Sequence, residues 1–121
     1  MRQLSELHLY GNKLHDGAII ALAKALERGA APLMTQLHLG HNNIGSAGLV
    51  ALANALAEGA LPRLEHLTIF HNAVGPDGAV ALARAATKGA MISLTVLGLS
   101  GNPIGDEGLR ALAEACSDDE V

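Results

Sequence analysis

A spacing of 30 residues recurs along this chain and constrains its fold more than any other feature. The asparagines that keep this spacing are Asn12, Asn42, Asn72 and Asn102. Apolar residues around each asparagine repeat as well, and the first copy is Leu4-x-x-Leu7-x-Leu9-x-x-Asn12-x-Leu14. All four copies keep this register without an insertion. Such self-similarity predicts a solenoid in which each repeat packs on the next.

The two halves of each repeat differ in their apolar periodicity. In the first half, Leu7 and Leu9 alternate with polar residues, as in a short strand with one buried face. In the second half, apolar residues recur with the spacing of one helix face. In the first copy these are Ile19, Leu22, Ala23 and Leu26. Each repeat is therefore predicted to contain one strand followed by one helix.

Residues that favour helix ends mark both limits of each predicted helix. We expect the helices to start near four equivalent positions, because acids and proline are favourable in a first turn. These positions are Asp16, Ser46, Pro76 and Asp106. Glycine suits the left-handed position after a helix, and this role is assigned to Gly29, Gly59 and Gly89. Small residues near the helix starts imply close approach to a neighbouring element, at Gly48, Gly78 and Gly108.

Strands connected through helices in a regular array form a parallel sheet with right-handed crossovers. Strands stack ~4.8 Å apart whereas helices need ~10 Å, so the array must curve with its strands inside. The predicted fold class is α/β, a right-handed βα superhelix of four 30-residue repeats. The parallel sheet lines the concave face of a horseshoe segment and the helices its convex face. We expect one domain over residues 1–121, with repeats at approximately 1–30, 31–60, 61–90 and 91–121.

The asparagine column is interpreted as structural rather than catalytic. An asparagine side chain carries both donors and acceptors, so it can bond the backbone groups that the turn after each strand leaves unpaired. Stacked through the solenoid, these side chains would form a ladder.

Composition excludes several classes of function. A net charge of −4 provides no basic surface for nucleic acid. No apolar run approaches the ~20 residues of a membrane span, and the first residues lack the apolar stretch of a signal peptide. One cysteine excludes an internal disulfide framework and suits a reducing compartment, so we expect a cytoplasmic protein. No phosphate-binding glycine motif and no nucleophile beside a histidine–carboxylate pair is found, so neither a cofactor nor an enzymatic activity is predicted.

Side chains between the patterned leucines are predicted to point away from the core onto the concave face. Five of the six histidines fall there, together with the single tyrosine and the single phenylalanine. Exposed aromatic side chains are common anchors of protein interfaces. The predicted partner-binding residues are Glu6, His8, Tyr10, His38, His41, His66, Thr68, Phe70 and His71.

The concave histidines allow three interpretations. They can be hydrogen-bonding surface residues, or they can form a pH-sensitive interface because protonation near pH 6.5 adds charge to one face. Two histidines on adjacent strands, such as His8 with His38 or His41 with His71, could also supply two zinc ligands. No closed set of four ligands is evident, so no metal site is predicted.

The strings Leu37-His38-Leu39-Gly40-His41-Asn42-Asn43-Ile44-Gly45 and its equivalent at 97–105 resemble the ribonuclease-inhibitor-like class of leucine-rich repeats. This class is found in ribonuclease inhibitor, NOD-like receptors and Ran GTPase-activating protein. The resemblance implies a horseshoe, an intracellular setting and protein ligands, and it carries over no catalytic residue. The expected function is protein binding through the concave face. The alternatives are a GTPase-activating or other regulatory fragment of a larger leucine-rich-repeat protein, and an architectural spacer.

The size of the predicted sheet limits what it can bind alone. Four short strands cover ~19 Å and give a face of roughly 250 Å², whereas a standard interface buries ~800 Å² per partner. No polar capping segment is visible at either end, although solenoid ends normally require one. We therefore expect a longer array, or ends covered by further repeats or by self-association.

Overall fold

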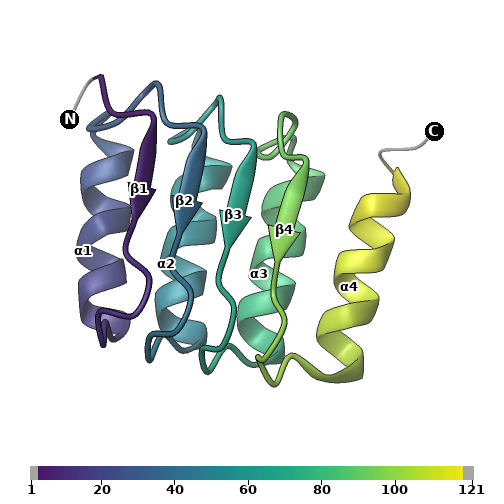
Figure 1. The fold of residues 1–121 in the computed structure, drawn as a ribbon. Coiled ribbons are helices and arrows are strands. Elements are labelled where there is room, and N and C mark those ends of the chain that lie inside the picture. Colours follow the sequence, from purple (N-terminus) through teal and green to yellow (C-terminus); the bar gives the residue numbers. More distant parts are fainter. Residues whose placement is uncertain (1–2, 119–121) are drawn as a thin grey trace.

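Four strand–helix units follow one another in a single row (Figure 1). The computed structural model describes residues 3–118, with side chains as far as residue 115. The strands are β1 (Glu6–His8), β2 (Gln36–His38), β3 (His66–Thr68) and β4 (Val96–Gly98). The helices are α1 (Asp16–Glu27), α2 (Ser46–Ala57), α3 (Pro76–Thr87) and α4 (Gly105–Asp118). This arrangement confirms the predicted fold class.

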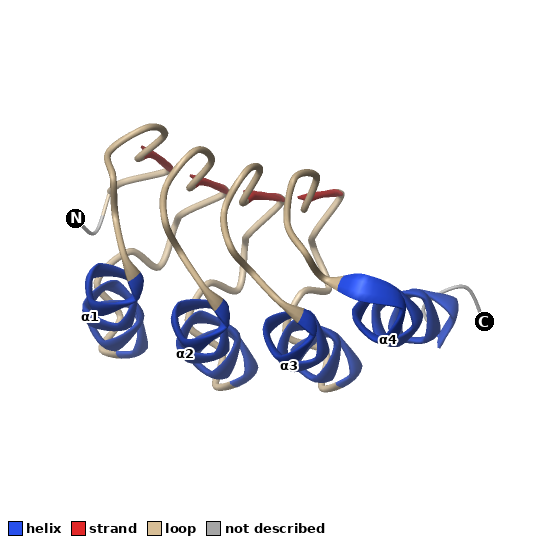
Figure 2. Ribbon diagram, turned by 90° about the horizontal axis from the view of Figure 1, so that it is seen from below, coloured by secondary structure: helices blue, strands red, loops and turns tan. Residues whose placement is uncertain are grey.

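The four strands form one parallel sheet in the order β1-β2-β3-β4. Each residue pairs with the residue 30 positions later, so that Leu7, Leu37, Leu67 and Leu97 stand in one row across the sheet. Figure 2 shows the helices in a longer row than the strands, which places the sheet on the inner face. The sequence period therefore sets the register directly, and equivalent side chains of neighbouring repeats lie side by side.

The core is an aliphatic layer between the sheet and the helices. Leu37, Leu52 and Leu67 are each 0% exposed, and each such side chain contributes about 1.5–3 kcal/mol through burial. The equivalent leucines of the outer strands, Leu7 and Leu97, are only partly buried. The core is thus complete in the middle of the row and open at both ends.

The helices end and begin where the sequence predicts. Gly29, Gly59 and Gly89 have φ values of +80°, +90° and +79°, which confirms their left-handed conformation. The Gly29 N–H donates to the Leu26 carbonyl at 3.0 Å, and the Ala30 N–H donates to the Ala25 carbonyl at 3.2 Å. These two bonds form the helix-terminating pair in which a left-handed glycine satisfies the last carbonyls.

Asp16 lies in the first turn of its own helix, as the sequence predicts, and it also stabilises the start of the next helix. Its Oδ1 accepts hydrogen bonds from the N–H groups of Gly45 at 2.7 Å and Gly48 at 3.0 Å, so it caps α2 rather than its own helix. A Cβ atom on Gly48 would lie 2.7 Å from this oxygen, which explains the glycine. The equivalent Ser46 caps α3 in the same way, through Gly75 and Gly78.

The third repeat interrupts this series of caps. Pro76 occupies the position of Asp16 and Ser46 and has no side-chain acceptor to offer α4. Figure 2 shows α4 turned out of the row formed by the other three helices. The boundary between α3 and α4 therefore lacks the side-chain cap that the two earlier boundaries between repeats have.

The asparagines form the predicted ladder. Asn42 Oδ1 accepts from the Asn12 and Leu14 N–H groups of the first repeat, at 2.9 Å each. Its Nδ2 lies 3.0 Å from the carbonyl oxygens of Leu9 and Leu39. Asn72 and Asn102 repeat the arrangement one and two steps later. The side chains of Asn42, Asn72 and Asn102 thus each tie their own turn to the preceding repeat.

Candidate functional site

Two rows of aromatic rings cross the concave face. The first, which we call the histidine ladder, consists of His8, His38 and His66. The His8 and His38 rings are stacked with centroids 4.6 Å apart, and His66 meets His38 edge-on at 6.5 Å. This contact between His8 and His38 follows from the register, because paired residues on adjacent strands lie within ring-stacking distance.

The second row, the tyrosine ladder, consists of Tyr10, His41 and His71 just beyond the strands. The Tyr10 and His41 centroids are 4.7 Å apart, and those of His41 and His71 are 4.4 Å apart. All three side chains are exposed, Tyr10 by 62%. The tyrosine ladder therefore presents a continuous aromatic edge to solvent across three repeats.

Hydrogen bonds fix the middle of the histidine ladder. His38 Nδ1 lies 2.7 Å from Thr68 Oγ1, and His38 Nε2 lies 3.0 Å from Gln36 Oε1. The Gln36 oxygen can only accept, so Nε2 donates to it and neutral His38 accepts from the Thr68 hydroxyl at Nδ1. At the sheet edge, His8 Nε2 lies 3.0 Å from Glu6 Oε1.

The environment of His38 favours its neutral form. Burial lowers the pKa of His38 below 6.5, and the neighbouring His8 and His66 lower it further, while Glu6 acts in the opposite direction. A histidine between two others is harder to protonate because its charge would meet theirs. The centre of the ladder is therefore less than half protonated at a pH where an ordinary histidine is half protonated.

The backbone beneath the tyrosine ladder is strained. His41 and His71 both have a φ of +54°, in the left-handed region that side chains other than glycine rarely adopt. The equivalent positions in the first and fourth repeats are Gly11 and Gly101, with φ values of +71° and +78°. The turn thus accommodates glycine readily, and the two middle repeats carry histidine there instead, at a cost of about 1–2 kcal/mol each.

Glycines on the next repeat make room for three of the rings. A Cβ atom on Gly40 would lie 3.2 Å from Tyr10 Cδ2. A Cβ atom on Gly98 would overlap the Phe70 ring, and one on Gly101 would overlap the His71 ring. Each ring therefore packs directly on the backbone of a glycine in the neighbouring repeat, as aromatic side chains do when they cover a cross-strand glycine.

Most of the predicted contact residues lie on this face, with different exposures. Glu6, His8, Tyr10, His41 and His71 are exposed, whereas His38, His66 and Phe70 are half-buried.

Thr68 departs from the prediction that it faces a partner. It is only 8% exposed, and its hydroxyl bonds His38, so it holds the ladder in place rather than offering contact area. Val96 is not among the predicted partner-binding residues, although it is 40% exposed and pairs with His66 across the sheet. Its position in the same column as Glu6 and His66 is the sequence feature that indicates this exposure.

The ladders do not gather metal ligands. Within the described part of the chain, no group of three or more His, Cys, Asp or Glu side chains could hold a metal ion. Stacked rings such as His8 and His38 direct their nitrogens along near-parallel planes, 22° apart, instead of toward one point. Among the described helices, none combines the length and the apolar character needed to cross a membrane.

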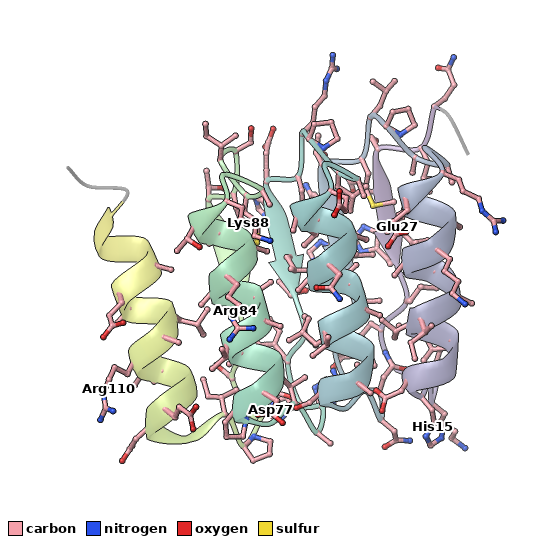
Figure 3. The ribbon with its side chains drawn as sticks, turned by 180° about the vertical axis from the view of Figure 1, so that it is seen from behind. His15, Glu27, Asp77, Arg84, Lys88 and Arg110 are labelled. Carbon is pink, nitrogen blue, oxygen red and sulfur yellow. The ribbon has the colours of Figure 1, made fainter. Side chains whose placement is uncertain are left out.

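The convex face carries a groove between α2 and α3, with a volume of about 550 Å³. Small side chains such as Ala57 and Ala81 line its floor, and Arg84, Lys88 and Asp77 stand beside it (Figure 3). This groove lies on the helix side of the molecule, away from both ladders. The two faces thus offer different chemistry, aromatic and histidine-rich inside, charged outside.

The model of a family described as "Leucine Rich repeat" matches residues 30–53, 61–83 and 90–113. These segments make up more than half of the 121 residues and coincide with the second to fourth repeats. The chain belongs to the leucine-rich-repeat family. Leucine-rich repeats in general form non-enzymatic protein-interaction modules, so the coarse functional class of this chain is a protein-interaction module.

The actin-binding site 2 of leiomodin-1 is a solved structure similar to this leucine-rich-repeat chain. The TM-score is 0.80 at 17% sequence identity, over 94% of this chain and 64% of that one. The chain thus spans less than two thirds of this neighbour, and the similarity concerns the fold. A comparison with curated protein sequences gives no significant match.

Proposed function

We propose that this leucine-rich-repeat chain binds a partner protein through its concave face, with the tyrosine ladder as the main contact. The observation that carries the proposal is the left-handed backbone of His41 and His71, where the outer repeats have glycine. Strained residues persist when the surrounding structure holds them, and they cluster at functional sites. Replacing glycine by histidine at both positions builds the exposed aromatic edge at the expense of stability.

The rings are also arranged for binding before a partner arrives. Packing on Gly40 and Gly101 and stacking within the ladder hold Tyr10, His41 and His71 in place. Ordered side chains lose little further entropy on association, so more of the contact energy appears as affinity. Exposed aromatic groups fixed in this way are typical interface anchors.

The finer assignments rest on the sequence strings. The nine-residue segments at 37–45 and 97–105 support membership of the ribonuclease-inhibitor-like class, and this class together with the single cysteine supports a cytoplasmic setting. Actin is named for the leiomodin-1 structure alone, and the proposal for this chain specifies no actin contact.

The experiment separates binding from folding by restoring glycine. The double variant His41→Gly, His71→Gly relieves the strain, but it also loses the ring stacking and makes the unfolded chain more flexible. These effects oppose each other, so its free energy of unfolding should stay within about 1 kcal/mol of the parent value. A photo-reactive amino acid at Phe70 in cells should cross-link a discrete partner protein in the parent chain. The same probe in the double variant should give at least tenfold less adduct.

The matched control carries the photo-reactive amino acid at Val80, which lines the convex groove. Adducts from Val80 should not respond to the glycine substitutions. If position 70 yields no discrete adduct while position 80 does, the concave proposal is wrong. If neither position yields one, the chain acts as a spacer.

A further inference from the structure

The two ends of the row leave core side chains uncovered. At the C-terminal end, a cavity of about 180 Å³ opens between β4 and α4, lined by residues such as Met91, Leu94, Leu97 and Leu112. Beside it Val96 is 40% exposed, and Leu109 on α4 is 60% exposed. At the N-terminal end, Leu4, Leu7 and Leu9 are only partly buried. Water contacts apolar surface at both ends that the middle repeats bury completely.

We propose that copies of this chain associate head to tail, with the β1–α1 end of one copy covering the β4–α4 end of another. Such an interface joins two different surfaces, so it repeats along a stack instead of closing in a symmetric pair. The proposal is independent of the partner on the concave face, and it rests on the backbone, side-chain and charge patterns of the two ends.

The hydrogen-bonding groups of the two sheet edges match. At each seam within the chain, one carbonyl accepts from two N–H groups of the next strand: Ser5 from Thr35 and Gln36, Thr35 from Glu65 and His66, and Glu65 from Thr95 and Val96. The next acceptor in this series is Thr95. The N–H groups of Ser5 and Glu6 in another copy are the equivalent donors, so β4 and β1 of two copies can pair in the same register as the strands within the chain.

The asparagine ladder is prepared for the same continuation. Asn12 Nδ2 lies 3.3 Å from the Tyr10 carbonyl oxygen. This is the contact that Asn42 makes with Gly40, at 3.1 Å, within its own repeat. The first asparagine therefore already makes one of the contacts that the later ones make within their own turn, although it has no preceding repeat to bond within the described chain. A second copy would supply that repeat.

Charge favours a second copy over an unrelated partner. The groove between α2 and α3 brings Asn54 to one side and Arg84 and Lys88 to the other. Repeat equivalence places Glu114 at the position of Asn54 on the outer side of α4, and Lys24 and Arg28 at the positions of Arg84 and Lys88 on the outer side of α1. At a seam between copies, the carboxylate of Glu114 would thus face two cations.

The repeats at the two ends carry opposite net charge in the sequence as a whole. The fourth repeat has six acids against one base, whereas the first repeat has four bases against three acids. Complementary charge of this kind selects the head-to-tail orientation, because two like ends repel each other.

One residue makes the seam between copies looser than the seams inside the chain. Ala18 stands where the later repeats have glycine, and a Cβ atom at the equivalent Gly48 would lie 2.7 Å from Asp16 Oδ1. At the new seam, Asp106 takes the position of Asp16 and must turn its carboxylate aside. We therefore expect reversible association that grows with protein concentration.

Sedimentation velocity of the 121-residue chain tests the proposal. The expected result is a weight-average mass that rises steadily with concentration beyond that of a dimer. Lys24→Glu and Glu114→Lys should each weaken association about tenfold, because like charges then meet at the seam. An equimolar mixture of the two variants should recover the parent behaviour, since every seam again joins opposite charges.

Arg63→Glu is the matched control, because Arg63 is exposed in the third repeat, away from both ends. It should leave association unchanged, and circular dichroism should show all four proteins folded. Zero-length cross-linking of mixed light and isotope-labelled chains should join Lys24 of one copy to Glu114 of another. A monomer at every concentration, or a mass that stops at the dimer, would overturn the proposal. So would a mixture of variants that fails to recover association.

Discussion

The interior repeats and the outer repeats share one sequence pattern but differ in what that pattern achieves. Leu37 and Leu67 are 0% exposed, whereas Leu7 and Leu97 occupy the same position in the motif and are only partly buried. Each repeat of a solenoid is stabilised mainly by its neighbours, and an outer repeat has one instead of two. The motif therefore determines the direction of a side chain, and the number of neighbouring repeats determines how much its burial contributes to the free energy of unfolding.

The largest expected difference concerns this leucine row. Leu67→Ala should lower the free energy of unfolding by about 3–5 kcal/mol, because it leaves a cavity in a closed core. Leu97→Ala should cost about 1–2 kcal/mol, because its site already opens toward the solvent-accessible cavity beside α4. Urea unfolding at low protein concentration measures both values. Equal losses would show that the open end is as well packed as the middle.

The asparagine column provides the next comparison. Asn42→Ala leaves the N–H groups of Asn12 and Leu14 without their acceptor, so it should cost about 2–4 kcal/mol. Asn12→Ala removes a single exposed contact to the Tyr10 carbonyl and should cost about 0.5 kcal/mol or less. Thermal unfolding of the two variants tests the contrast. A large loss of stability for Asn12→Ala in dilute monomer would mean that the asparagine stabilises its own turn rather than the contact between repeats.

Much of the fold could be predicted from the sequence, because the 30-residue period of the motif equals the offset between paired residues on neighbouring strands. The limits of the helices could also be predicted, because a left-handed glycine ends a helix and acids or proline favour its first turn whatever the rest of the fold. The cap that Asp16 provides to α2 could not be found in this way, since the acid also fits the first turn of its own helix. The burial of Thr68 depends on its cross-strand neighbours, and no single repeat displays that information.

The caps between repeats give a smaller effect. Asp16→Ala removes the acceptor for Gly45 and Gly48 and should destabilise the chain by about 1 kcal/mol. Asp106→Ala changes the equivalent residue of the fourth repeat, which has no following helix to cap within the described chain, and should change monomer stability by less than about 0.5 kcal/mol. Hydrogen exchange of the first α2 amides should rise only for Asp16→Ala. Exchange that rises equally in α1 would assign the aspartate to its own helix.

The smallest expected effect is the pH dependence that His38 confers. Its pKa is lowered in the folded chain, so the unfolded chain binds more protons as the pH falls below 6.5. The stabilisation is therefore complete above pH 6.5 and is lost as the pH drops toward the lowered pKa. His38→Gln should flatten the dependence of unfolding on pH in this window. A parent protein with no slope in this window would contradict the lowered pKa of His38.

The uniform register also governs how this molecule can change in length. Residues 31–60 contain the groups that bond both neighbouring repeats. Asn42 bonds the repeat before it, and Ser46 bonds the repeat after it. A tandem copy of this segment would join the row by the same bonds, and it would add one histidine to each ladder. Lengthening the recognition face therefore requires only gene duplication of whole units, whereas insertion of a single residue within a strand would turn the side chains after it in that strand to the opposite face.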